Sequence, residues 1–278
     1  MMYASQHKCM ERVNRHDLFT SLSARIQWLH SFLEFRTDDV QALIVGQKYI
    51  KAVIPAIVDV VYKKLLSYDI TARVFSTRDS REEGPVEKWH TEESEEIQNR
   101  KIFLRWYLTK LNSDCTCMEY WEYLDKVGMM HAGKGRLNPL HVDYILMGAC
   151  LGFIQDSLFT AILSHPHLEL DCKTSIVKAL GKVIWIQNDL IERWHNSDGA
   201  EFSKNDGNTM NNVCCLRGYP NHTETLSDSN GSDSRSKTNS SRTRDSNKTS
   251  LGRPIEEALH LADPIYRCPF SGRRHNPA

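Results

Sequence analysis

Apolar residues recur every three or four positions through the first 195 residues of this 278-residue chain, and no convincing alternating strand pattern interrupts them. This spacing places the apolar side chains on one face of a helix. Helices of this kind bury their apolar stripes only against one another. The chain is therefore predicted to be all-α. The first stripe consists of Leu18, Leu22, Ile26, Leu29 and Leu33.

Breaks in this periodicity divide the region into about seven helices. They are expected over residues 18–33, 37–44, 55–65, 93–111, 121–131, 140–164 and 172–195. Pro55 is placed in the first turn of the third helix, because proline lacks the N–H that a helix interior needs. Residues 76–92 are charged and contain Gly84-Pro85, which predicts a loop.

The apolar content ends abruptly near residue 195. All six tryptophans precede residue 196, and between Asn221 and Arg253 the only apolar residues are Leu226 and Leu251. Such a Ser-, Asn- and Thr-rich segment buries too little apolar surface to offset its ordering entropy. The sequence therefore predicts a flexible N-terminus over 1–14, one helical domain over 15–195 and a disordered tail over 196–278.

The charge balance and the N-terminus exclude several classes of partner. The 35 lysines and arginines match the 35 aspartates and glutamates, which argues against nucleic-acid binding. The N-terminus has no apolar signal core, and no stretch approaches the length of a membrane span. The eight cysteines show no regular spacing, which is typical of cytosolic thiols. We therefore expect a cytoplasmic protein without nucleic-acid or membrane partners.

The segment from Trp121 to His131 holds the most informative histidine. His131 ends an aromatic-rich amphipathic stretch and follows Gly128, Met129 and Met130 directly. These neighbours suit an imidazole that points into an apolar slot, which is the environment of a histidine bound to haem iron. Taken alone, a histidine of this kind is also compatible with a purely structural role.

Several blocks of the chain, in their order and spacing, resemble the protoglobin and globin-coupled sensor family of haem-binding sensor globins. The resemblance covers roughly residues 15–195. The blocks that carry it are Arg25–Leu33, Ile57–Tyr62, Arg100–Phe103 with Trp106, Val127–His131, and the last helix pair ending in Trp185–Asp189.

The resemblance implies a globin-like fold with an extra N-terminal helix and a haem b cofactor. His131 matches the proximal iron ligand, Tyr62 the distal tyrosine and Phe103 an aromatic residue on the distal side. In this family the last two helices commonly form a homodimer interface. One departure is Val61, which stands where archaeal protoglobins carry a tryptophan and implies a more open distal side.

Further residues are assigned around the implied haem. Phe75 is a candidate to wedge the haem at a helix–loop corner. Met130 is a candidate haem contact, although core filling explains it equally well. Tyr62 is compatible with an ordinary core tyrosine, and Asn99 with a solvated helix face.

The remaining histidines and one cysteine have weaker claims to a haem role. His90 is a weak candidate for a sixth iron ligand, and Cys268-Pro269 resembles a haem-regulatory dipeptide of a kind common by chance. Surface or capping positions are expected for His90, His141, His165, His167 and His195.

The sequence thus predicts a non-enzymatic haem protein that reversibly binds a diatomic gas (oxygen, nitric oxide or carbon monoxide) as a gas sensor. One alternative is a haem-dependent oxidase or nitric oxide dioxygenase. Another is a haem-free helical dimer that acts as a scaffold, for which His131 is dispensable.

Overall fold

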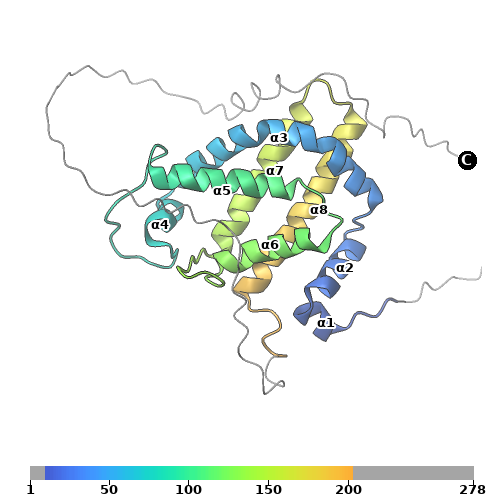
Figure 1. Cartoon of the computed structure of the whole chain (residues 1–278), viewed down its shortest axis with the longest axis horizontal. Coiled ribbons are helices and arrows are strands. Elements are labelled where there is room, and N and C mark those ends of the chain that lie inside the picture. The colour runs from blue at the N-terminus through green and yellow to red at the C-terminus, as the bar shows by residue number, and fades with distance from the viewer. Residues whose placement is uncertain (1–9, 203–278) are drawn as a thin grey trace, which may run out of the picture.

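The computed structural model describes residues 10–202, and this part of the chain forms eight helices and no β-strand (Figure 1). This confirms the all-α class. The helices are α1 (Arg15–Thr20), α2 (Leu22–Phe32), α3 (Thr37–Leu66), α4 (Asp69–Thr77), α5 (Glu95–Leu111), α6 (Met118–His131), α7 (Tyr144–Ser164) and α8 (Leu170–His195).

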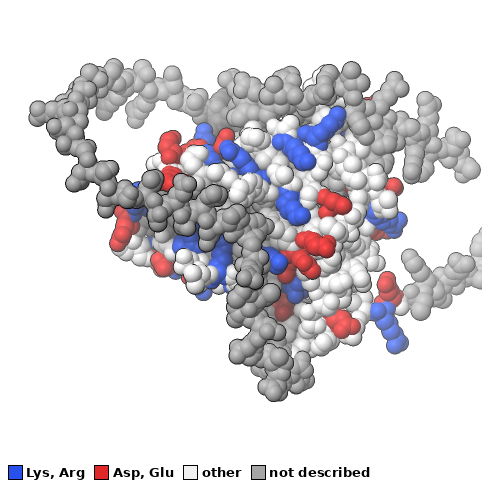
Figure 2. All heavy atoms as spheres, in the orientation of Figure 1, with Lys and Arg blue, Asp and Glu red and all other residues white. Residues whose placement is uncertain are grey.

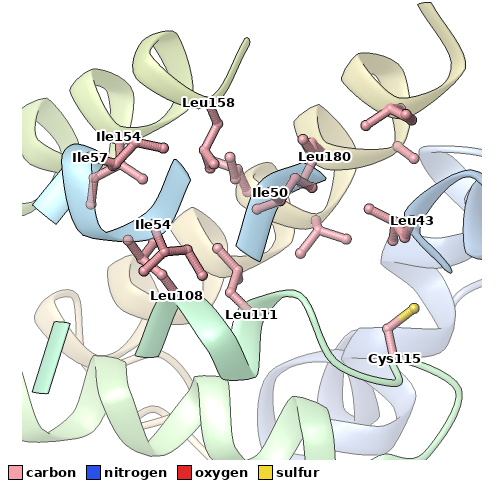
Figure 3. Packing of buried hydrophobic residues seen from close by; sticks show 14 of the residues in the cluster. Leu43, Ile50, Ile54, Ile57, Leu108, Leu111, Cys115, Ile154, Leu158 and Leu180 are labelled. Atoms are coloured by element: carbon pink, nitrogen blue, oxygen red, sulfur yellow. The ribbon is translucent and has the colours of Figure 1, made fainter. Parts of the chain in front are cut away.

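The long helix α3 lies at the centre of the core, in contact with α5, α7 and α8. Ile50, Ile54 and Ile57 of α3 meet Leu108 and Leu111 from α5 and side chains of α7 and α8 (Figure 3). Ile50, Ile57 and Leu108 have no exposed surface. The helices that carry the candidate site are therefore held by one continuous core.

The sequence prediction of a separate second and third helix was wrong. They form one continuous helix of 30 residues, α3, with Pro55 in its interior. Proline in a helix interior costs about 3 kcal/mol. The neighbouring Val53, Ile54 and Ile57 are at most 4% exposed, and each such side chain contributes about 1.5–3 kcal/mol on burial. Burial on both sides of Pro55 therefore outweighs the lost hydrogen bond.

Two other predicted elements differ from the structure. The expected first helix is interrupted at Ser21, whose side chain accepts a hydrogen bond from the Ala24 N–H and so caps α2. The helix α4 was not predicted. It precedes the expected loop, overlapping it only at Ser76 and Thr77, and its C-cap Arg78 has a left-handed conformation with φ 65°.

The helix α7 corrects the expectation that no segment reaches the length of a membrane span. With 21 residues, it is the one helix of the described chain that is long and apolar enough to cross a membrane. In this structure it packs against α3 and α8 and buries Leu151, Ile154, Leu158, Ala161 and Ile162, while 33% of its apolar window is buried in all.

The described chain continues past α8 and returns to the N-terminal helices. The Arg25 guanidinium of α2 donates hydrogen bonds to Asp189 of α8 at 2.6 and 2.8 Å and to Asp198 at 2.8 Å. Arg25 is only 6% exposed, so this network ties α2 to α8. The predicted disordered tail lies outside the described residues from position 203 onward.

The helices α6 and α8 lie in backbone contact at Gly128. A Cβ on Gly128 would collide with the Leu190 carbonyl oxygen and come within 2.9 Å of the Ile191 Cα. These are backbone atoms of a buried helix, which cannot rotate away as a side chain would. Only glycine allows α6 to lie this close to α8, three residues before His131.

We expect Gly128→Ala to destabilise the protein by about 2–3 kcal/mol, as overpacking of a rigid core does. The added methyl group pushes α6 away from α8, so haem affinity should fall as well. Urea unfolding of both proteins measures the first effect, and haem titration measures the second.

Gly152 of α7 provides the matched control, because a Cβ there meets nothing within 4 Å. Gly152→Ala should leave stability unchanged or raise it by up to about 1 kcal/mol through helix propensity. Equal stability of Gly128→Ala and wild type would show that the α6–α8 contact does not require glycine.

Candidate functional site

A cavity of about 760 Å³ lies among α3, α4, α5, α6 and α7. Its walls are mainly apolar, and its size lies within the range of about 300–1,000 Å³ typical of small-molecule sites. All of the residues assigned to the site from the sequence line this one cavity, although they come from four helices. They are Tyr62, Phe75, Phe103, Met130 and His131.

His131 is the last residue of α6, and both ends of this helix are anchored. At the N-terminal end, the Tyr120 hydroxyl donates to the Leu111 carbonyl at 2.8 Å and the Trp121 Nε1 to the Cys115 carbonyl at 3.1 Å. At the other end Gly128 lies on α8. The imidazole is thus presented to the cavity by a fixed helix rather than by a loop.

The backbone hydrogen bond of His131 fixes which ring nitrogen carries the proton. Its Nδ1 lies 2.8 Å from the carbonyl oxygen of Val127, one turn earlier. A carbonyl oxygen only accepts, so Nδ1 donates and Nε2 keeps its lone pair when the ring is neutral. This is the arrangement of a metal-binding histidine, whose second nitrogen is held by a backbone carbonyl.

The environment also keeps the imidazole neutral. Burial lowers the pKa of His131 to about 4, and the positive charges of Arg136 and Arg100 act in the same direction. At neutral pH the ring is therefore uncharged, as a haem ligand must be.

Tyr62 contributes a protonated phenol to the same cavity. It lies on α3 and is 7% exposed, with its ring centroid 5.8 Å from that of Phe75 on α4. Burial raises the pKa of Tyr62 well above its ordinary value. No hydrogen bond from its hydroxyl is found within residues 10–202. The group is thus a hydrogen-bond donor without a protein acceptor in this part of the chain.

Phe103 and Trp106 of α5 line the mouth of the cavity. Their rings meet edge to face with centroids 5.5 Å apart, and the side chains are 60% and 61% exposed. Asn99, one turn earlier, also lines the cavity and is exposed. Val61 stands where archaeal protoglobins carry a tryptophan. It is buried and lines the cavity beside Tyr62.

Several lining residues were missed from the sequence. Tyr107 and Tyr123 carry no pattern that separates them from core aromatics, and Cys150 is one of several thiols on apolar helices. Burial raises the pKa of Cys150 to about 11, so this thiol stays protonated. Arg78, Arg100 and Arg136 also line the cavity. Arg100 belonged to a recognised block, but Arg136 lies in an irregular loop where no periodicity points to it.

The other candidate ligands are not brought to the cavity. His90 is not among its lining residues. His165 was expected at the surface or at a cap, but it is fully buried, with its ring 4.7 Å from that of Tyr49. That expectation was wrong, because the α7–α8 connection folds into the core. Cys268-Pro269 lies outside the described residues.

A metal ion bound to His131 would need most of its other ligands from a cofactor rather than from the protein. No group of three or more His, Cys, Asp or Glu side chains suited to a metal ion occurs in the described part of the chain. A single neutral imidazole in a large apolar cavity fits a macrocycle that supplies the remaining nitrogen ligands.

The model of the Protoglobin family matches residues 22–201. This chain belongs to the protoglobin family. A search of curated proteins gave no match. Membership confirms the resemblance noted from the sequence and the globin-like fold, and it gives this protoglobin a globin-type role in haem and gas binding.

Proposed function

We propose that this protoglobin binds haem b through His131 and reversibly binds a diatomic gas beside Tyr62 as a gas sensor. The observation that carries the proposal is the neutral imidazole of His131, which faces an apolar cavity with Nε2 unprotonated. The hydroxyl of Tyr62, from a different helix, lines the same cavity.

Each residue has a distinct task in this mechanism. Haem, when bound, would supply the iron that takes up the gas. His131 would hold the iron through Nε2, and the Val127 carbonyl keeps the ring in the required tautomer. Tyr62 would donate a hydrogen bond to a polar diatomic ligand, and the apolar wall would limit the access of water.

His131→Gly should abolish the Soret spectrum of a histidine-bound haem, because no other histidine of the described chain lines the cavity. Added imidazole should restore that spectrum, since it refills the vacated space with the same nitrogen donor. Visible absorption spectra with and without imidazole measure both effects.

The control is His167→Gly, which removes an exposed imidazole outside the cavity and should leave the spectrum unchanged. Rescue by imidazole separates loss of the ligand from loss of folding. A histidine-type spectrum in His131→Gly without imidazole would refute the proximal assignment.

Tyr62→Phe should raise the oxygen dissociation rate about tenfold, the effect of losing a hydrogen bond worth somewhat more than 1 kcal/mol. Carbon monoxide dissociation should change little, because this ligand accepts hydrogen bonds weakly. Since burial raises the pKa of Tyr62, the phenol stays protonated and its contribution should persist from pH 7 to pH 10.

Stopped-flow measurements of both gases at the two pH values test this role of Tyr62. An unchanged oxygen rate in Tyr62→Phe would remove the distal assignment. If the oxygen dissociation rates of Tyr62→Phe and wild type become equal by pH 10, the phenol of Tyr62 ionises at a lower pH than its burial implies.

The proposal includes a homodimer formed through α7 and α8. Large apolar side chains on these helices are exposed in the single chain: Ile145 by 75%, Leu163 by 47%, Leu170 by 72% and Trp185 by 63%. Exposed apolar residues of this size on neighbouring helices are typical of an interface. A sensor built in this way could carry a change at the haem to the partner through α8, which also contacts α6.

Trp185→Glu should shift the protein from dimer to monomer, because it places a charge in the proposed apolar interface. Sedimentation velocity at several concentrations measures the change. Trp89→Glu, at a position that is 47% exposed and outside α7 and α8, is the matched control. A wild-type monomer, or an equal shift in both variants, would contradict the proposed interface.

The proposal also includes that the protein binds the gas reversibly without acting as an enzyme, and that it is located in the cytoplasm. The four cysteines of the described chain are free thiols, which supports a reducing compartment. Sustained oxidation of peroxide-dependent substrates or of nitric oxide by the purified haem protein would favour an enzyme instead.

The proposal includes no nucleic-acid partner. The face of the molecule seen in Figure 2 mixes acidic and basic side chains rather than showing one basic surface, which supports this part of the proposal.

A further inference from the structure

The cavity contains an uneven set of charged side chains. Among the described residues that line it, the only lysine, arginine, aspartate or glutamate side chains are Arg78, Glu96, Arg100 and Arg136. Three guanidinium groups therefore face one carboxylate, which leaves two positive charges uncompensated in a mainly apolar wall. Arg136 is exposed and Arg78 and Arg100 are half-buried, so these charges lie at the rim of the cavity, where an anionic ligand could pair with them.

The ion pairs and hydrogen bonds of these arginines show which guanidinium group lacks a partner among the described residues. Arg100 pairs with Glu96, its Nε and NH2 lying 2.9 and 2.8 Å from the same carboxylate oxygen. Arg78 donates to the backbone carbonyls of Asn138 and Pro139 at 2.9 and 3.3 Å, which holds the loop after α6 but does not neutralise its charge. No ion pair or hydrogen bond of the Arg136 side chain is found within residues 10–202.

The three guanidinium groups are close enough to act on one another. Burial lowers the pKa of Arg136, and the charges of Arg100 and Arg78 lower it further. The charges of Arg100 and Arg136 also act on the His131 imidazole. The three arginines are thus within electrostatic range of Arg136 or of each other, and Arg100 and Arg136 are also within range of the proximal histidine.

We infer that Arg136, together with Arg78 and Arg100, binds the two propionate carboxylates of the haem. The inference rests on the proposed haem binding and goes further by naming the side chains that receive the carboxylates. Haem b carries two carboxylates, which match the two uncompensated positive charges. Guanidinium groups bind carboxylates with paired, charge-assisted hydrogen bonds.

Arg136 is the residue whose role can be isolated. Arg78 also supports the loop and Arg100 is already paired, so their substitution would disturb other contacts. Arg136 has no such contact, and its removal should leave the fold intact.

The experiment compares haemin with haemin dimethyl ester, which has the same ring and iron but no carboxylate charge. The full-length apoprotein is titrated with each, and the dissociation constant is taken from Soret absorption and tryptophan quenching. Arg136→Gln is the test variant. Lys134→Gln is the matched control, because Lys134 lies in the same loop, has the same charge and lies outside the haem cavity, with its Nζ 5.2 Å from the Trp194 ring centroid.

Wild type should bind haemin about 10- to 100-fold more tightly than the diester, the effect expected for charge-assisted hydrogen bonds. Arg136→Gln should lose most of this preference by weakening haemin binding alone. Lys134→Gln should retain it. Raising the salt concentration should reduce the preference in wild type, because the rim is partly open to solvent.

Three outcomes would overturn the inference. Equal affinity of wild type for haemin and the diester would show that the carboxylates are not recognised, while haem binding itself would stand. An undiminished preference in Arg136→Gln would show that Arg136 does not bind them. Failure of wild type to bind either compound would refute both this inference and the proposed function.

Discussion

The backbone contact between α6 and α8 at Gly128 is the constraint on which the site depends. The absent side chain lets the two helices approach until only a hydrogen would fit, against the Leu190 carbonyl and the Ile191 Cα. Because α8 packs against α3 and α7 as well, this contact ties the end of α6 to the whole core. His131, three residues later, is therefore positioned by the tertiary structure rather than by its own short helix end.

The cavity keeps both of its candidate functional groups, His131 and Tyr62, uncharged. The imidazole of His131 must be neutral to bind a metal, and burial keeps it so. The positive charges of Arg100 and Arg136 act in the same direction, while Tyr62 remains a neutral donor because burial disfavours the phenolate. A cavity with mainly apolar walls and three arginines among its lining residues can thus hold a ligand that is largely apolar but carries negative charge.

Much of the fold could be predicted from periodicity, and the failures have physical causes. The apolar stripes of α5, α7 and α8 predicted those helices within a few residues of their bounds. Pro55 was misplaced because local propensity opposes a helix interior, whereas burial of Val53, Ile54 and Ile57 stabilises one. The helix α4 is short and contributes only Ala72 and Val74 to the buried set, so its pattern was too weak to recognise.

The order of residues along the chain was enough to predict the all-α class and the family, and with the family the candidates His131 and Tyr62. Both follow from local order, namely the spacing of apolar residues and the run of blocks along the chain. The packing of the helices brings Tyr62, Phe75 and His131 to one cavity, which Arg136 also lines without a partner among residues 10–202. Such neighbours are distant along the chain or lie in an irregular loop, and their proximity arises only when the helices pack.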